Sequence, residues 1–416
     1  MSGQLPTLPA ELLSLVFEHA DRGSLSRIAR CSRYLYEVAA PFLYRHIELA
    51  GLTSKTQSVG RVTAVATLLL RRPDLASCVR HCRFIPGARY SWGNLDPEID
   101  VSEETADQDL EARLGEVVSQ SSHAASVKDA ITAASHSTRE HIDWLKKAEP
   151  DVKGAWHEDS LLALVLPRLS NLETLRLDHF ACERTRQMLL RVAGGEKPFD
   201  AKPALTRLEY IVFHASRDVW MEYGRLFTPV FLIPSVRAIY HSASTTKPGS
   251  HEYNEQGIPD KVLADSSPGS SGCTHLELHA CRLSAVDMRN MLAKPKGLET
   301  FIYTVAPPVE HAPIAVSYPA LWRALLLQSE TLENIWIDDF RREGWIELDE
   351  DDYDPIRTFK DFPRLKRLRI PDDNYFSASL DNLTGGDDDL GGGNFEDGLT
   401  ALPAGLEVPW CLWKDF

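Results

Sequence analysis

A short apolar pattern recurs along most of the chain. It has the form Leu-x-x-Leu-x-Leu, with substitutions, and Leu172-x-x-Leu175-x-Leu177 is the clearest copy. From this copy to the one that starts at Leu365, successive copies lie about 25 to 37 residues apart, a spacing typical of stacked repeats. The other copies, including degenerate ones at both ends, are Val79-x-x-Cys82-x-Phe84, Leu208-x-x-Ile211-x-Phe213, Val236-x-x-Ile239-x-His241, Cys273-x-x-Leu276-x-Leu278, Leu298-x-x-Phe301-x-Tyr303, Leu332-x-x-Ile335-x-Ile337, Leu365-x-x-Leu368-x-Ile370 and Leu406-x-x-Pro409-x-Cys411.

Helical patterns lie between the copies. Ser284-x-x-Asp287 predicts a capping box ahead of an apolar run, and a second helix is predicted from Tyr318-Pro319 onward. A strand followed by a helix, repeated, buries its apolar faces only by stacking on its neighbours. The pattern therefore predicts an α/β repeat. An ordinary α/β domain whose buried strands share an aliphatic pattern is the alternative.

The strand positions between the buried ones should form a second surface. Side chains two apart on a strand share a face, so these residues should project to the solvent side, where repeat arrays bind partners. Tyr, Trp and Arg among them are the residue types that dominate interface hot spots. The set is Arg176, Asp178, Tyr210, Val212, Tyr240, His275, Glu277, His279, Ile302, Trp336, Arg367 and Arg369.

The first fifty residues have a different pattern, which predicts three short amphipathic helices. Leu8-Pro9 gives an extended start, Ser24 and Ser32 are predicted to cap the second and third helices, and Pro41 to end the third. Three helices this short leave one apolar face in need of a partner. The predicted apolar positions are Leu12, Leu13, Val16, Phe17, Leu25, Ile28, Ala29, Leu35, Val38 and Ala39.

This segment resembles an F-box. Leu8-Pro9, Glu11-Leu12-Leu13 and Val16-Phe17 follow the order usual in that family, and Cys31 with Tyr34 fits its last helix. The ending from Pro41 to Leu49 is similar to that of many fungal F-box proteins, and the array resembles the irregular leucine-rich repeats found behind them. The resemblance implies a Skp-type adaptor, and through it a cullin, as partners. It places adaptor binding on Leu8, Pro9, Leu12, Leu13, Val16, Phe17, Leu25 and Ile28.

Composition changes suggest the domain organisation. Nine carboxylates stand against Arg113 alone between Asp96 and Glu116, and one amphipathic helix is predicted after them from Val127 to Leu145. The predicted parts are an F-box at 1–50, a linker helix and first degenerate repeat at 51–92, an acidic and helical insertion at 93–158, a repeat array at 159–376, and a Gly/Asp-rich loop with a tail at 377–416.

The net charge and the cysteines indicate which partners and which cellular compartment to expect. A net charge of −15 argues against nucleic acid as the main partner, because phosphate binding depends on Lys and Arg. No apolar run approaches the roughly 20 residues needed to span a bilayer, and the first residues do not form a signal peptide. Seven scattered cysteines suit a reducing compartment, so a cytoplasmic or nuclear location is expected.

The sequence contains no phosphate-binding glycine loop, no His-Glu-x-x-His and no Gly-x-Ser-x-Gly. One group could still carry chemistry, since His275, Glu277 and His279 share a strand face and could ligate zinc or iron. Their outward position also fits a binding surface, and no cofactor or metal is expected.

Three functional hypotheses follow. The favoured one is a non-enzymatic substrate receptor of an SCF-type cullin-RING ubiquitin ligase. The F-box would dock the adaptor, and the repeats would bind an unidentified target protein through Arg176, Tyr210, Tyr240, His275, Glu277, His279, Trp336, Arg367 and Arg369. The alternatives are an F-box scaffold without a degradation role, and a metal-dependent enzyme built on His275, Glu277 and His279.

Overall fold

The computed structural model describes residues 8–50, 59–85, 122–148, 158–178, 183–214, 221–222, 227–242, 244–245, 261–305, 318–339, 359–370 and 408–409. The chain forms two compact units, Met1–Leu208 and Glu209–Phe416. The degenerate copy ending at Cys411, the acidic stretch 96–116 and the Gly/Asp-rich loop lie outside the described residues, apart from Val408 and Pro409. No helix in the described ranges is long and apolar enough to cross a membrane.

The first unit begins with the three predicted helices, α1 (Ala10–Glu18), α2 (Arg22–Ala29) and α3 (Arg33–Leu43). Ser32 caps α3, as predicted, but the cap of α2 is Asp21, whose carboxylate accepts the Ser24 amide at 3.0 Å. The predictions of Ser24 as the cap and of Pro41 as the stop were therefore wrong. Pro41 lies inside α3 and the helix continues to Leu43.

A parallel three-stranded sheet follows in the same unit. Its order is β1 (His46–Ala50), β2 (His81–Ile85) and β3 (Thr174–Asp178). The connecting helices are α4 (Val59–Arg71), α5 (Pro73–Ala76), α9 (Glu158–Val165) and α10 (Glu183–Gly194), with the short η3 (Leu166–Arg168) before β3. Residues His46 to Leu49, which end the F-box-like segment, thus form the first strand of the sheet.

The insertion contains two described helices where one was predicted. They are α7 (Ser122–Ala134) and α8 (Thr138–Ala148). The turn at Ser135–Ser137 separates them and changes which residues face inward, so that Trp144 is buried while Ile142 is exposed.

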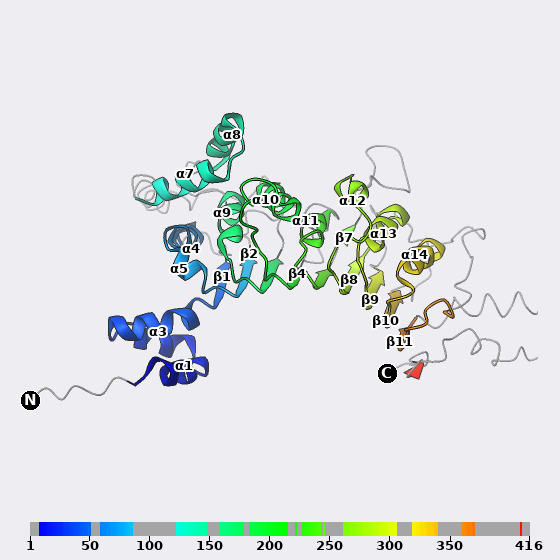
Figure 1. Ribbon diagram of the computed structural model, residues 1–416, viewed down its shortest axis with the longest axis horizontal. Coiled ribbons are helices and arrows are strands. Elements are labelled where there is room, and N and C mark those ends of the chain that lie inside the picture. The colour runs from blue at the N-terminus through cyan, green and yellow to red at the C-terminus, as the bar shows by residue number, and fades with distance from the viewer. Residues whose placement is uncertain are drawn as a thin grey trace, which may run out of the picture. The chain divides into compact units, whose positions relative to one another are not determined.

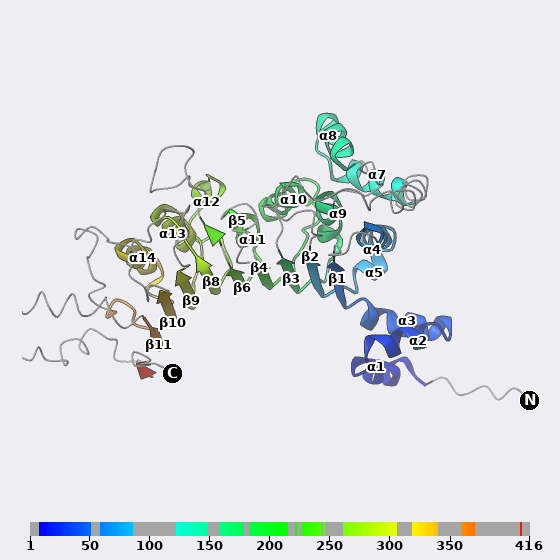
Figure 2. The same ribbon diagram turned by 180° about the vertical axis from the view of Figure 1, so that it is seen from behind.

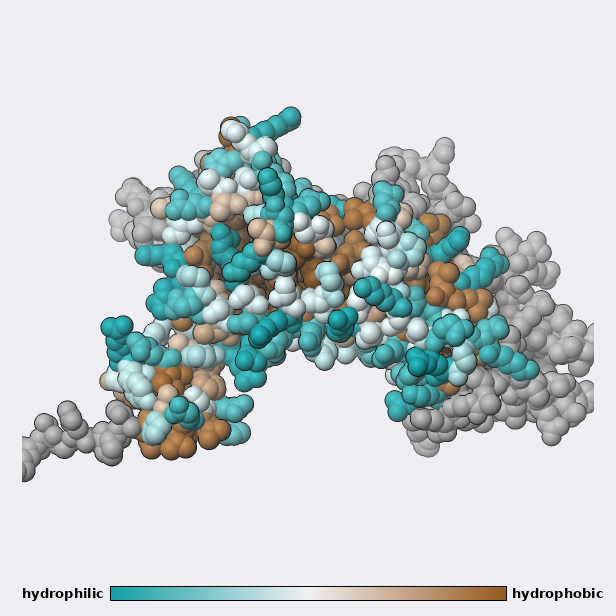
Figure 3. Space-filling view, in the orientation of Figure 1, coloured by the Kyte–Doolittle hydropathy of each residue, from teal (hydrophilic) through white to brown (hydrophobic). Residues whose placement is uncertain are grey.

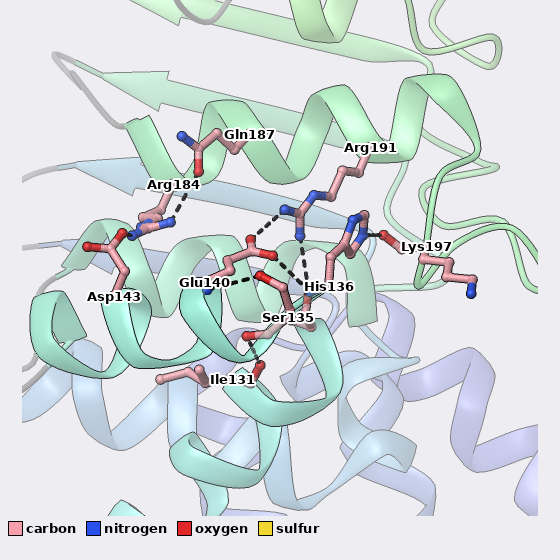
Figure 4. A network of polar contacts seen from close by, with 11 residues as sticks. Ile131, Ser135, His136, Glu140, Asp143, Arg184, Gln187, Arg191 and Lys197 are labelled. Carbon is pink, nitrogen blue, oxygen red and sulfur yellow. Dashed lines mark hydrogen bonds and ion pairs between the residues drawn. The ribbon is translucent and has the colours of Figure 1, made fainter.

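Two arginines of α10 hold this helix pair (Figure 4). Arg191 donates to the Ala134 carbonyl, at the end of α7, and to Glu140 of α8. Arg184 donates to Asp143, and its guanidinium lies 5.6 Å from the centre of the Trp144 ring. The α7–α8 pair is therefore fixed to a helix about fifty residues further along the chain.

The second unit is built on a longer parallel sheet (Figures 1 and 2). Its strands, in spatial order, are β4 (Tyr210–His214), β6 (Ala238–Ser242), β8 (His275–Cys281), β9 (Thr300–Val305), β10 (Asn334–Asp339), β11 (Arg367–Arg369) and β12 (Val408–Pro409). A two-stranded sheet pairs β5 (Met221–Glu222) with β7 (Ser244–Thr245).

The helices of this unit are α11 (Phe227–Phe231), α12 (Lys261–Asp265), α13 (Ala285–Leu292), α14 (Tyr318–Leu325) and η4 (Leu326–Gln328). Ser284 caps α13 by accepting the Asp287 amide at 3.1 Å, which confirms the predicted capping box. Both views show the labelled α-helices on one side of the sheet and no described helix over the other side. That uncovered side of β4 to β11 is called the bare face below.

The repeated motif forms the core in both units. Its three apolar positions are buried in every copy from Val79 to Ile370, and the α/β repeat is confirmed at this level. A hydrogen-bond pattern repeats with it, because the carbonyl just before a strand accepts two consecutive amides at the start of the next strand. The accepting carbonyls are those of Arg45, Arg80, Glu209, Arg237, Thr274, Glu299 and Glu333.

Buried polar side chains add contacts between repeats in the second unit. Gln328 donates to the carbonyls of Leu292 (2.8 Å) and Pro295 (3.2 Å) and accepts the Leu298 amide at 3.0 Å. His241, at a core position of its copy, is different: neither ring nitrogen has a hydrogen-bond partner among the residues that the structure describes. Its ring instead meets Phe213 and Phe227, at 5.4 and 5.8 Å between ring centres.

Candidate functional site

Two surfaces stand out, and the first is on α1. Leu12 (49% exposed), Leu15 (61%) and Val16 (59%) lie at helical spacing, and Leu8 (53%) lies just before the helix; all four leave large apolar side chains in solvent. These four residues are called the α1 patch. Figure 3 shows hydrophobic surface gathered on the three-helix module at the lower left. A contiguous apolar patch on a small helical module is typical of a protein interface.

The rest of the module positions this patch. Leu13, Phe17, Leu25 and Ala39 form the buried core beneath it. The Phe17 ring packs edge-on against Phe42, with 6.1 Å between ring centres. The Tyr34 hydroxyl donates to the Leu8 carbonyl at 2.8 Å, which ties the extended start of the chain to α3.

The predicted adaptor-binding residues therefore divide into two groups. Leu8, Pro9, Leu12 and Val16 are exposed, whereas Leu13, Phe17 and Leu25 are buried in the core and Ile28 is half-buried. Leu13, Phe17 and Leu25 therefore support the exposed residues from within the core and do not themselves contact a partner. Leu15 was missed in the sequence, although it lies three residues after Leu12 and so shares its side of the helix.

The second surface is the bare face of the second unit. The strand register aligns Tyr240 with Glu277, Glu277 with Ile302, Ile302 with Trp336 and Trp336 with Arg369. A second row runs alongside, in which Ala238, His275, Thr300, Asn334 and Arg367 are aligned. The residues predicted for target binding in this unit thus lie in these two rows, apart from His279, which lies two residues after Glu277 on β8. Tyr210 opposes Ala238 in the second row.

The middle of this face is a hydrogen-bonded group. His275 and His279 each place Nε2 against one carboxylate oxygen of Glu277, at 2.7 and 2.8 Å. A carboxylate only accepts, so both ring nitrogens must donate. Partial burial acts to raise the pKa of Glu277, but the two hydrogen bonds and the neighbouring imidazoles outweigh it and lower the pKa to about 2. Glu277 is therefore an anion that is already satisfied.

The metal alternative does not fit this geometry. Both Nε2 atoms point at the carboxylate, and no group of three or more His, Cys, Asp or Glu side chains in the described ranges could hold a metal ion. Cys273 and Cys281, which flank the group, are buried on the core side, and burial raises the pKa of Cys273 to about 12. The three side chains are brought together, but as a hydrogen-bonded surface group.

The far end of the face is aromatic and cationic. Trp336 is 36% exposed, and the Arg369 guanidinium lies 4.3 Å from the centre of its ring. This is the geometry of a cation–π pair. Arg367 is exposed on the same strand face two residues earlier. At the other end Tyr210 is 46% exposed, and the Tyr240 ring lies 5.3 Å from that of His275.

Arg176 belongs to the first unit and has a different setting. Its Nε donates to Asp178 at 2.8 Å, and Arg83 of β2 donates to the same carboxylate through Nε and Nη2 at 2.9 and 2.7 Å. Asp178 was predicted to project to solvent, but it is 3% exposed. It is buried because two arginines cover it, so the prediction was wrong for this residue.

Comparison with known families identifies one part of the chain. Residues 5–50 match the F-box-like family, so the chain carries an F-box-like domain at its N-terminal end. F-box domains bind Skp-type adaptors, and the presence of this domain suggests an SCF adaptor-type role. No curated protein matches the chain.

Proposed function

We propose that this protein is a substrate receptor of an SCF-type cullin-RING ubiquitin ligase, acting in the cytoplasm or nucleus. The α1 patch docks a Skp-type adaptor, which carries the cullin. The repeats, which we interpret as an irregular leucine-rich-repeat array, hold a target protein on the bare face. The chain contributes proximity by bringing lysines of the target close to a ubiquitin-charged enzyme, and none of its own side chains reacts.

One observation carries the proposal. The F-box-like domain leaves Leu12, Leu15 and Val16 in solvent above a complete core of its own. An apolar surface that the module does not need for folding is what a docking face requires. The bare face supports the second half, because it presents Tyr, Trp and Arg in register and no helix of the described residues covers them (Figures 1 and 2).

The decisive experiment is co-purification of the tagged chain from its native cells, with partners identified by mass spectrometry. A Leu12→Ala, Val16→Ala variant removes exposed side chains and should fold normally, yet lose the adaptor and the cullin. A Leu8→Ala, Pro9→Ala variant should weaken the same contact. Ser14→Ala and Glu18→Gln, which alter polar residues of α1 outside the patch, provide a control on the same helix.

The outcomes separate the hypotheses. Recovery of adaptor and cullin with the native chain, and loss of both with the Leu12 and Val16 variant, would support the receptor. Adaptor without cullin would favour the scaffold role, and neither partner would refute both. For the target-binding half, Tyr210→Ala with Trp336→Ala should abolish capture of a target and leave adaptor recovery unchanged, and unchanged capture would refute the assignment of the bare face.

A further inference from the structure

The cationic end of the bare face has unused binding capacity. Among the described residues, the Arg367 side chain makes no hydrogen bond or ion pair, and the Arg369 guanidinium pairs only with the Asp338 carboxylate, at 3.6 Å, beyond hydrogen-bond distance. Lys366 of the same segment is directed to Glu333 instead, with 2.7 Å between Nζ and the carboxylate. Arg367 and Arg369 therefore present guanidinium donors from one strand face, on backbone positions about 7 Å apart.

An apolar surface adjoins these two arginines. Trp336 is aligned with Arg369 on one side and with half-buried Ile302 on the other. Arg369 lies over the Trp336 ring, which holds the guanidinium in place before any ligand arrives. A guanidinium that is already positioned loses less side-chain entropy on binding.

From Ile302 towards β6, the next residues of the row are Glu277 and Tyr240. Glu277 is saturated by His275 and His279, so it does not require a cation from a partner. Tyr240 continues the row with an aromatic ring. From β6 to β11 the row crosses five strands and spans about 19 Å, the length of about six residues of extended peptide.

We propose that the bare face binds an extended segment of the target that carries an anionic side chain, a carboxylate or a phosphate, next to a large apolar side chain. The anion pairs with Arg367 and Arg369, and the apolar side chain packs on Trp336 and Ile302. This inference rests on the proposed function and names the chemistry of its target. Nucleic acid is disfavoured, because Glu277 and Asp338 lie in the same surface and the chain has a net charge of −15.

The test uses the full chain and a displayed library of random peptides about twelve residues long, enough to exceed the row. Enriched peptides should combine Asp or Glu with a neighbouring Leu, Ile, Phe or Trp. The best peptide is then synthesised with a fluorescent label in four forms, with Glu, phosphoserine, Gln or Lys at the anionic position, and its affinity is measured by fluorescence anisotropy.

The Lys and Gln forms should bind at least roughly tenfold more weakly than the better of the Glu and phosphoserine forms. The difference between those two forms identifies the anion. In the Arg367→Ala, Arg369→Ala variant this preference should vanish. The Arg364→Ala, Lys366→Ala variant removes the same charge from the same segment, but neither residue belongs to the row and Lys366 pairs with Glu333. It should keep the preference.

Two results would overturn the inference: no acidic enrichment, or a preference that survives in the Arg367 and Arg369 variant. Neither result would affect the proposed function, because adaptor and cullin recovery is measured separately. Conversely, if the native chain recovered no adaptor, the ligase role would be refuted. The peptide preference is measured separately and would be unaffected.

Discussion

Single residues show where the motif tolerates exceptions. The sixth position of each copy is a core position, and Leu, Phe, Tyr or Ile occupies it in the neighbouring copies. His241 fills it with a polar ring that has no hydrogen-bond partner in the described part of the chain. Burial lowers the pKa of His241 to about 3, so the ring is neutral when folded. Packing against the rings of Phe213 and Phe227 offsets the free-energy cost of burying this polar ring.

His241 should make stability depend on pH. The folded pKa is below the unfolded value of about 6.5, so the unfolded chain binds the proton first, and stability is lost as pH falls from about 6.5 towards about 3. Between about pH 7.5 and about pH 5 this group alone should remove about 2 kcal/mol of unfolding free energy. Urea unfolding of the native chain and of a His241→Leu variant at both pH values measures how much unfolding free energy each chain loses. The variant should lack the loss that is due to His241. Equal pH dependence in the two chains would contradict the prediction.

The residues of α1 show a limit of sequence reasoning. Leu12, Leu13, Leu15, Val16 and Phe17 are all apolar, so the pattern does not say which side of the helix faces inward. The division into an exposed patch and a buried core follows from packing on α3, through contacts such as Phe17 on Phe42. Tertiary contacts of this kind are invisible to local periodicity.

Elements within the repeats were more predictable than those of the insertion. The buried positions of each strand follow from a pattern that recurs, and each copy reinforces the others. The α7–α8 pair has no such repetition. Its inward face depends on Arg184 and Arg191, which lie on α10, and the spacing of its own apolar residues gave one helix in place of two. The alignment of the bare-face row, in contrast, follows from the motif, because every residue in it stands directly before the last core position of its copy.

Arg191 should be critical for holding the α7–α8 pair. Its guanidinium is largely buried and contacts both helices, so Arg191→Ala leaves Glu140 and the Ala134 carbonyl without it. Removing one partner of such a pair costs about 3 kcal/mol or more. Hydrogen exchange should therefore become faster across residues 122–148 and stay unchanged in β8 to β10. Arg139→Ala, at an exposed position of α8, is the control and should alter neither region.

At the scale of the whole molecule, the two functional surfaces belong to different units. The α1 patch lies in Met1–Leu208 and the bare-face row in Glu209–Phe416. Each surface can therefore be removed without altering the other. A receptor that works by proximity nevertheless needs both on one chain, since the target is modified only where it is held near the ligase.

This requirement gives a test in cells. The Leu12→Ala, Val16→Ala variant should hold the target without the adaptor, and the Tyr210→Ala, Trp336→Ala variant should hold the adaptor without the target. Either variant, replacing the native chain, should lengthen the half-life of the target in a synthesis-arrest chase. Expressing both variants together should not restore degradation, because neither molecule joins target and ligase. Restored degradation would mean that two copies act as one assembly or that the bare face and the α1 patch need not share a chain, and the proximity mechanism would then be wrong as stated.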